Sequence, residues 1–379
     1  SGPGSVTLSW TAAPDPAQNV EADRFRVYTS RDGRAFDNGD LTAEETSLEL
    51  SGLDYPANYY FLVTAENDGG ESMPSEQLGV RTSWTGDETV LLLVNGFDRL
   101  DPDEREWENT RDFVVQHAEA IASAGEGFYT FDYASNEAVA NGDIDLDAYM
   151  AVIFWTGEES TNFESFSDEE MAIVGAYLAS GGKMFISGSE IGWDLDERGD
   201  ETTRAWLQDV LRVGYVSDDA ETHSVGAAAG GIFEGMSDFD FDDGSAGTYD
   251  PDWPDVLEPA GGSTVNLQYA AAGGAGLEYD GGEEKIVFFG FPFETVLGEA
   301  VRAGLMERIL TFLVPDVPQP PEEDELMEEA DAAEDMPEEP ADDLAVDADG
   351  ADTADAEPDD GDSGPPDVEG GCSCVVAAG

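Results

Sequence analysis

Basic residues are scarce in this chain of 379 residues. It has 15 Lys and Arg against 86 Asp and Glu, which gives a formal net charge of -71. Nucleic acid is therefore strongly disfavoured as a partner, because phosphate binding needs clustered Lys and Arg. Anionic lipid surfaces are disfavoured for the same reason. No run of 18 apolar residues occurs, so we expect no segment of this sequence to cross a membrane.

Cysteine is almost absent, and both copies, Cys372 and Cys374, lie near the C-terminus. This excludes a disulfide-stapled core, a zinc site built on cysteines and a cysteine nucleophile within the folded part. Apolar residues make up 40% of the chain and aromatic residues 10%, which is enough for hydrophobic cores.

The acidic residues are spread over the whole chain. Residues 316–379 contain 24 of them and no Lys or Arg, and the rest of the chain still carries -47. Such a surface repels itself at low salt and is tolerated when ions screen it. We interpret it as adaptation to a salty exterior or to divalent cations, with a lineage-wide acidic composition as the alternative. Residues 315–371 are poor in large apolar groups, so we expect a disordered acidic stalk there.

Residues 1–83 have the pattern of a small β-sandwich. Apolar and polar residues alternate with a period of two, as at Tyr59, Phe61 and Val63, and Gly-containing turns separate the alternating stretches. Short strands at this spacing are typical of sandwich folds.

This stretch resembles a fibronectin type III domain. Residues 5–10, which end at Trp10, resemble the second strand of that family, Leu53 and Tyr59 resemble its tyrosine corner, and residues 67–76 match its late hairpin. No first strand precedes Ser5, so we expect the domain to begin at its second strand and to leave an unpaired edge. The resemblance implies a spacer or a binding module.

Residues 88–314 read as an α/β domain in which strands and helices alternate. Residues 90–94 form a continuous apolar run, which is typical of a strand buried on both faces. Ser167 and Glu170 have the spacing of a capping box at a helix start. We expect a flavodoxin-like, mainly parallel sheet covered by helices on both faces. The expected strands are 90–94, 128–131, 150–155, 183–187 and 286–289, and the expected helices are 105–124, 167–178, 201–212 and 297–313.

Polar loops follow four of these strands. Ligands of open α/β sheets bind outside the carboxyl ends of the strands, so we expect these loops to form one binding rim. Crowded carboxylates there would raise each other's pKa or recruit a hard cation, and the alternative is that they cap helix N-termini. The candidate ligand-binding residues are Asn95, Asp98, Glu158, Glu159, Ser187 and Glu294, and Glu190 is a further acidic candidate.

The motifs at these loops resemble the class I glutamine amidotransferase-like fold. More narrowly, the chain resembles secreted bacterial proteins that pair such a domain with fibronectin type III and carry names such as N-acetylmuramoyl-L-alanine amidase or xanthan lyase. The matching stretches are residues 94–99, 156–161, 185–195, 247–255 and 290–295.

The nucleophile of the resembled family is missing. Those enzymes place a Cys, activated by a His, on the turn after a central strand, whereas residues 187–190 contain no thiol. Ser189 beside Glu190 is a candidate replacement, with His223 as its base. His117 lies among apolar neighbours, so we expect it to be packed in the core. The missing thiol predicts a pseudoenzyme.

A second acidic stretch covers residues 238–244. Phe239 alternates with acids there, so we expect an edge strand with solvated carboxylates. The alternative is a calcium site, although the spacing does not fit an EF-hand, and calcium is the one cofactor to which the sequence points. Its candidate ligands are Asp240, Asp242, Asp243 and Asp250.

Both ends of the chain have the character of fragment boundaries, with no initiator Met and no signal peptide. Residues 372–379 resemble the start of a myxobacterial sorting tail, in which a Cys motif precedes a membrane anchor. The resemblance implies processing at Cys372 and Cys374, and a location that is secreted or on the outer cell surface. Membrane attachment would then depend on an anchor beyond this sequence.

Together these features predict a non-catalytic, modular surface protein. Its α/β domain would bind an extracellular glycan, peptidoglycan or protein ligand at the strand ends. The rival is an extracellular hydrolase of peptidoglycan or polysaccharide. It would use either Ser189 or a cation held by carboxylates, and the carboxylates would be Glu158, Glu190 and Glu294.

Overall fold

The computed structural model describes residues 4–12, 22–39, 41–82, 91–98, 113–124, 129–160, 164–270, 273–315 and the backbone of 374–378. The predicted acidic stalk and Cys372 lie outside the described residues. Within the described part, no helix has the length and apolar character needed to cross a membrane.

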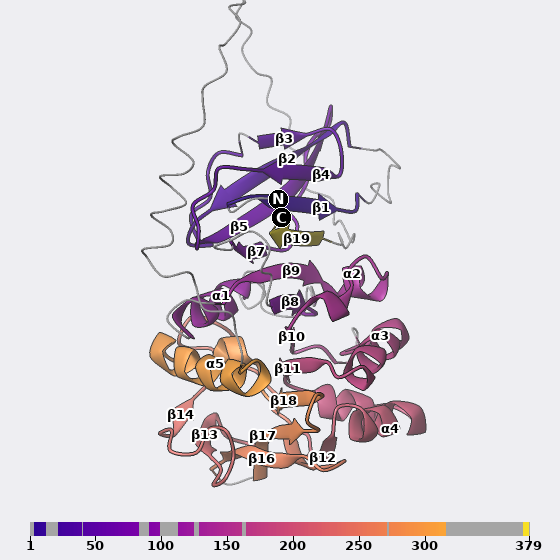
Figure 1. Cartoon of the computed structure of the whole chain (residues 1–379), viewed down its shortest axis with the longest axis vertical. Coiled ribbons are helices and arrows are strands. Elements are labelled where there is room, and N and C mark those ends of the chain that lie inside the picture. Colours follow the sequence, from indigo (N-terminus) through magenta and orange to yellow (C-terminus); the bar gives the residue numbers. More distant parts are fainter. Residues whose placement is uncertain are drawn as a thin grey trace, which may run out of the picture. The chain divides into compact units, whose positions relative to one another are not determined.

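The N-terminal part is an antiparallel sandwich, as the alternating pattern predicts (Figure 1). Trp10 and Phe25 meet edge to face in its core, with ring centroids 5.3 Å apart. The backbone N–H of Asp54 donates to the Tyr59 hydroxyl at 2.8 Å, which confirms the predicted tyrosine corner. The strands are β1 Val6–Trp10, β2 Arg24–Ser30, β3 Leu41–Ala43, β4 Ser47–Leu50, β5 Asn58–Asn67, β6 Gly70–Glu71 and β7 Leu78–Arg81.

The edge that we expected to be unpaired is covered. Strand β19, Cys374–Ala378, pairs antiparallel with β1 along the whole of β1, from Val6 to Trp10. The far C-terminal segment is thus extended and paired, and its assignment as the start of a sorting or anchor segment stays a prediction.

The second part contains five neighbouring parallel strands. Their order across the sheet is β9, β8, β10, β11 and β18, so the apolar runs near residues 92, 153, 185 and 288 lie side by side and point the same way, as predicted. Antiparallel strands extend the sheet beyond β18, so the sheet is mixed. The parallel strands are β8 Leu91–Asn95, β9 Phe131–Ser135, β10 Ala151–Gly157, β11 Lys183–Gly188 and β18 Lys285–Phe289, and the other strands are β12 Val213–Ser217, β13 Ser224–Ala227, β14 Phe239–Asp240, β15 Val256–Pro259, β16 Thr264–Tyr269 and β17 Gly273–Asp280.

Both faces of the parallel strands are buried, which explains their continuous apolar runs. In β8, Leu91 and Leu93 belong to a core shared with α1 and α5. Leu92 and Val94 belong to a second core shared with α3 and α4. Figure 1 shows α1 and α5 on one side of these strands and α2, α3 and α4 on the other. The helices are α1 Val114–Ser123, α2 Asn136–Ala140, α3 Asp168–Ala179, α4 Glu201–Asp209 and α5 Glu299–Leu313, with short helices η2 Leu146–Ala148, η3 Trp193–Arg198 and η4 Phe293–Thr295.

The capping box at the start of α3 is confirmed, since Ser167 and Glu170 bond reciprocally to each other's backbone N–H. Several predicted boundaries are wrong. The strand expected at 128–131 is described as 131–135, because its polar residues Asp132 and Ser135 are buried and broke the apolar pattern. The closing helix begins at Glu299 rather than Leu297, because Gly298 has a φ of 88°, outside the helical region.

Candidate functional site

The carboxyl ends of β8, β10, β11 and β18 lie at one edge of the sheet. The predicted polar loops therefore meet there, and we call this edge the strand rim. Glu158 and Ser160 are among its residues, and several predicted rim residues have structural partners that are described below.

Three of the predicted ligand-binding residues hold the rim loops, and two of them, Asp98 and Glu159, tie one loop to another. The Asp98 carboxylate accepts a hydrogen bond from Asn136 Nδ2 at 2.9 Å, and the Asp98 backbone N–H donates to the Glu159 carboxylate. Asn95 Oδ1 accepts from the Phe97 backbone N–H at 3.1 Å. These contacts give Asn95, Asp98 and Glu159 a role in holding the rim, and 1% exposure keeps Glu159 from solvent.

The turn after β11 places a carboxylate, not the predicted serine, at its strained position. Glu190 has a φ of 55°, in the left-handed region that non-glycine residues seldom adopt. A strained residue between a strand and a helix is where the nucleophile of an elbow-type enzyme sits. Ser189, one residue earlier, donates both its backbone N–H and its hydroxyl to Gly157 O, at 2.9 and 3.3 Å. Ser187 is completely buried.

The predicted Ser189–His223 pair is wrong. His223 Nε2 lies 2.7 Å from Asp250 Oδ1, and its ring packs on Phe241 with centroids 5.0 Å apart. Within the described residues, neither histidine contacts Ser189. A serine nucleophile needs a base within hydrogen-bond reach, and Ser189 has none in this part of the chain.

Glu294 points into the core rather than to the rim surface. Its carboxyl has no exposed surface, and Oε1 accepts a hydrogen bond from the Tyr249 hydroxyl at 2.6 Å. Its Oε2 lies 3.9 Å from Nε2 of His117, which is also completely buried. His117 stacks on Trp155 with centroids 4.4 Å apart, which confirms the expected core position.

Burial shifts the pKa of each group in this interior cluster toward its neutral form. It raises the pKa of Glu294 from 4.5 to about 7 and lowers the pKa of His117 from 6.5 to about 4. It also raises the pKa of the Tyr249 hydroxyl well above its ordinary value. His117 and Glu294 are therefore both largely uncharged between these two values.

The acidic stretch forms a loop held together by Asp242. This carboxylate is buried rather than solvated as expected, and it accepts hydrogen bonds from the Ala246 N–H at 2.9 Å and from the N–H and hydroxyl of Thr248, both at 2.8 Å. Asp243 accepts from Ser245, and Asp250 pairs with His223. In the described part of the chain, no three His, Cys, Asp or Glu side chains form a group that could hold a metal ion, so the predicted calcium ligands are not gathered.

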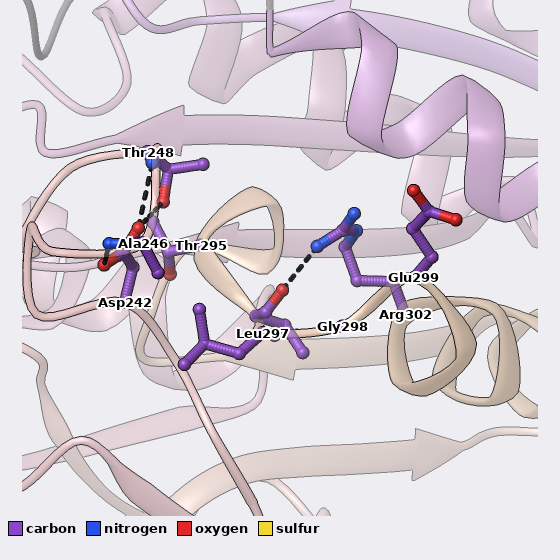
Figure 2. Close-up of a pocket in the computed structure, with 9 residues that line it drawn as sticks. Asp242, Ala246, Thr248, Thr295, Leu297, Gly298, Glu299 and Arg302 are labelled. Carbon is purple, nitrogen blue, oxygen red and sulfur yellow. Dashed lines mark hydrogen bonds between the residues drawn. The ribbon is translucent and has the colours of Figure 1, made fainter.

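A cavity of about 420 Å³ opens beside this loop, just past the carboxyl end of β18 (Figure 2). One wall is the loop with Asp242 and Thr248, and the other runs from the end of η4 into the first turn of α5. We call this cavity the β18 pocket. Its lining residues are Asp242, Ala246, Thr248, Thr295, Val296, Leu297, Gly298, Glu299 and Arg302.

The sequence analysis missed every lining residue of the β18 pocket except Asp242. Thr295 follows the predicted Glu294, and Arg302 lies one turn into the closing helix. Arg302 donates from Nη1 to Val296 O at 2.6 Å. The available signal was the placement of a rare basic residue next to a predicted rim loop.

Comparisons with known proteins concern mainly the N-terminal part. Residues 1–81 match the fibronectin type III domain family. The human cell adhesion molecule DSCAM is 34% identical over 83 residues, which are 21% of this chain and 4% of that protein. The chain therefore spans only a small fraction of the length of this relative.

Among solved structures, an exo-beta-1,4-mannosidase from an Opitutaceae bacterium is 10% identical, with a TM-score of 0.36 over 57% of this chain and 35% of its own. A GMP synthase protein from Thermoplasma acidophilum is 14% identical, with a TM-score of 0.34 over 59% of this chain and 93% of its own. Similarities at this level support no conclusion about the α/β part. The N-terminal residues, by contrast, form a fibronectin type III domain, a module typical of extracellular adhesion and binding proteins.

Proposed function

We propose that this chain is a non-catalytic binding protein, secreted or displayed on the outer cell surface, whose α/β part binds an extracellular glycan in the β18 pocket. The fibronectin type III domain and its similarity to a cell adhesion molecule support an extracellular binding role. The strongly acidic surface is suited to a salty exterior, where ions screen its charge.

The strand order supports an amidotransferase-like α/β domain. The order β9, β8, β10, β11, β18 follows the chain order 2-1-3-4-5, which is the order of flavodoxin-like sheets. The hydroxyl of Ser189 is engaged by Gly157 O, and no thiol is present at the turn. Both features favour binding over catalysis.

One observation carries the proposal, namely a polar cavity at the carboxyl end of a parallel strand, where open α/β sheets bind ligands. Its volume of about 420 Å³ lies in the lower part of the range of roughly 300–1,000 Å³ for small-molecule sites. Thr248, Glu299 and Arg302, which are exposed or half-buried, give it both hydrogen-bond donors and acceptors, which a sugar ring with several hydroxyls requires.

A glycan array tests the proposal with a variant that fills the cavity. Ala246 is exposed at the mouth of the β18 pocket, so Ala246→Trp should block the pocket without disturbing the core. The control is Ala35→Trp, an equally exposed alanine in the sandwich. We expect the natural chain and the control to bind the same glycans on the array, and Ala246→Trp to bind none of them. Retention of no glycan by the natural chain, or equal retention by Ala246→Trp, would contradict the proposal. Glycan cleavage lost in Ser189→Ala would instead support the hydrolase.

A further inference from the structure

Arg302 is a basic residue that lines the β18 pocket, and the charges of Glu119 and Glu299 act on it without a close ion pair among the described residues. Its side-chain hydrogen bond runs from Nη1 to the backbone oxygen of Val296, and no ion pair joins it to an acid in the described part of the chain. Other arginines are ion-paired, such as Arg31 with Asp54 at 2.9 Å and Arg204 with Asp196 at 2.7 Å. In a chain with 86 acids and 15 bases, an arginine that faces a cavity in this way is a chemical feature to be explained.

The remaining nitrogens of the guanidinium are still available. A guanidinium has five N–H donors in a planar fork, and the contact with Val296 O occupies one nitrogen. Partial burial lowers the pKa of Arg302, so its charge is incompletely solvated where it stands. A planar anion with two oxygens is the group that such a fork binds best.

The start of α5 adds donors on the same wall. Gly298 caps the helix without a side-chain hydrogen bond. The backbone N–H groups of Val301 and Arg302 bond to Gly298 O, whereas those of Glu299 and Ala300 have no backbone acceptor among the described residues. Free N–H groups and the helix dipole both favour a negative group at this position. Figure 2 shows the Glu299 carboxylate on the same side of the helix start as the Arg302 guanidinium, and its charge acts on Arg302.

The opposite wall is the loop with Asp242 and Thr248. Asp242 has no exposed surface, and its carboxylate is used on Ala246 and Thr248. Thr248 is half-buried and its hydroxyl donates to Asp242, which leaves the hydroxyl oxygen as an acceptor toward the cavity that Thr248 lines. The loop wall therefore offers an acceptor to a sugar hydroxyl.

We propose that the β18 pocket binds a sugar that carries a carboxylate, with the carboxylate on Arg302 and the start of α5, and a sugar hydroxyl on Thr248. This inference rests on the proposed function and narrows its ligand to an acidic sugar. Because the protein itself is strongly negative, the approach of such a ligand is opposed at long range. The contact with Arg302 has to overcome this repulsion locally.

Calorimetric titration of the full chain with D-glucuronate and with D-glucose, which differ only in the carboxylate, tests the inference. We expect glucuronate to bind at least tenfold more tightly, and its affinity to rise with added NaCl as the repulsion is screened. Arg302→Gln should weaken the binding of glucuronate at least tenfold and that of glucose less than twofold. Arg302→Lys should have an intermediate affinity for glucuronate, since lysine keeps the charge but lacks the planar fork of donors. The control is Arg308→Gln on the same helix. Arg308 also bonds to backbone oxygens, at Ile232 and Glu234, but lies outside the pocket, so this variant should bind both sugars like the natural chain.

The outcomes separate this inference from the proposed function. Equal binding of both sugars, abolished by Ala246→Trp, would overturn the acidic ligand and leave the glycan pocket standing. Binding of neither sugar here and of no glycan on the array would overturn both. If Arg302→Gln melts at the same temperature as Arg308→Gln and still binds glucuronate fully, the role of Arg302 is wrong.

Discussion

His117 and Glu294 face each other in the core of the α/β part, with Nε2 of the histidine 3.9 Å from Oε2 of the acid. Neither side chain has exposed surface, and neither of these two atoms has a hydrogen-bond partner among the described residues. Burial keeps both groups neutral, but their pKa values move in opposite directions. The two residues should therefore make opposite contributions to the pH dependence of stability.

Glu294→Gln should change the pH dependence of unfolding. The folded pKa of Glu294 is about 7 and its ordinary value is 4.5, so between these values the folded state holds a proton that the unfolded state has lost. Stability then falls as the pH rises through this window, by about 1.4 kcal/mol per pH unit. Glutamine removes this loss and still accepts a hydrogen bond from Tyr249.

Urea unfolding at pH 5, 6, 7 and 8 measures the difference. Across the window, the free energy of unfolding of the natural chain should fall by about 3 kcal/mol relative to that of Glu294→Gln. The control is Glu307→Gln, which removes an exposed carboxyl from α5. A constant difference for Glu294→Gln would show that its carboxyl titrates normally.

His117→Gln should show that His117 changes the pH dependence of stability in the opposite direction. The folded pKa of His117 is about 4 against 6.5 unfolded, so the unfolded state binds the extra proton in this window and the stability due to His117 rises with pH. Between pH 5 and 6.5, the free energy of unfolding of the natural chain should rise by about 2 kcal/mol relative to that of the variant. The lost packing on Trp155 adds a cost that does not depend on pH. The double variant with Glu294→Gln should lack both slopes, and a slope that persists there would refute this assignment.

Features set by neighbouring residues could be predicted from the sequence. The capping box at Ser167 depends on residues three apart, and the parallel strands follow from short apolar runs that only a two-sided core can bury. The core position of His117 followed from its apolar helical neighbours. In each case the physical cause lies within a few residues along the chain.

Features set by tertiary contacts could not be predicted in this way. The pattern placed Glu294 on a rim loop, but η4 turns it inward to a tyrosine 45 residues away in sequence. We predicted a solvated Asp242 because it alternates with Phe241, yet β14 ends at Asp240 and the carboxylate folds back onto its own loop. The β18 pocket combines that loop with the start of α5, so no local pattern contains it.

The turn at Glu190 should be more stable with glycine than with alanine. Both substitutions remove the side chain, so the comparison isolates the backbone, which has a φ of 55°. The left-handed region costs a residue with a Cβ roughly 1–2 kcal/mol, and glycine adopts it freely. We expect the free energy of unfolding, measured with urea, to be about 1 kcal/mol higher for Glu190→Gly than for Glu190→Ala. The control is Ser189, which is not in the left-handed region, so Ser189→Ala should be at least as stable as Ser189→Gly. The same order of stability at both sites would argue against strain at Glu190.

Asp242→Ala should destabilise the protein and open the β18 pocket, because its carboxylate ties the loop at Ala246 and Thr248. Hydrogen bonds to a charged group contribute about 1.5–3 kcal/mol each, and solvent can replace part of them after truncation, so we expect a loss of about 2–4 kcal/mol. The control is Asp243→Ala, the next residue, which is exposed and bonds only to Ser245 among the described residues. Its loss should stay below about 1 kcal/mol. Equal losses in the two variants, measured by urea unfolding at pH 7, would mean that the loop is held by its backbone and that the Asp242 hydrogen bonds contribute little to stability.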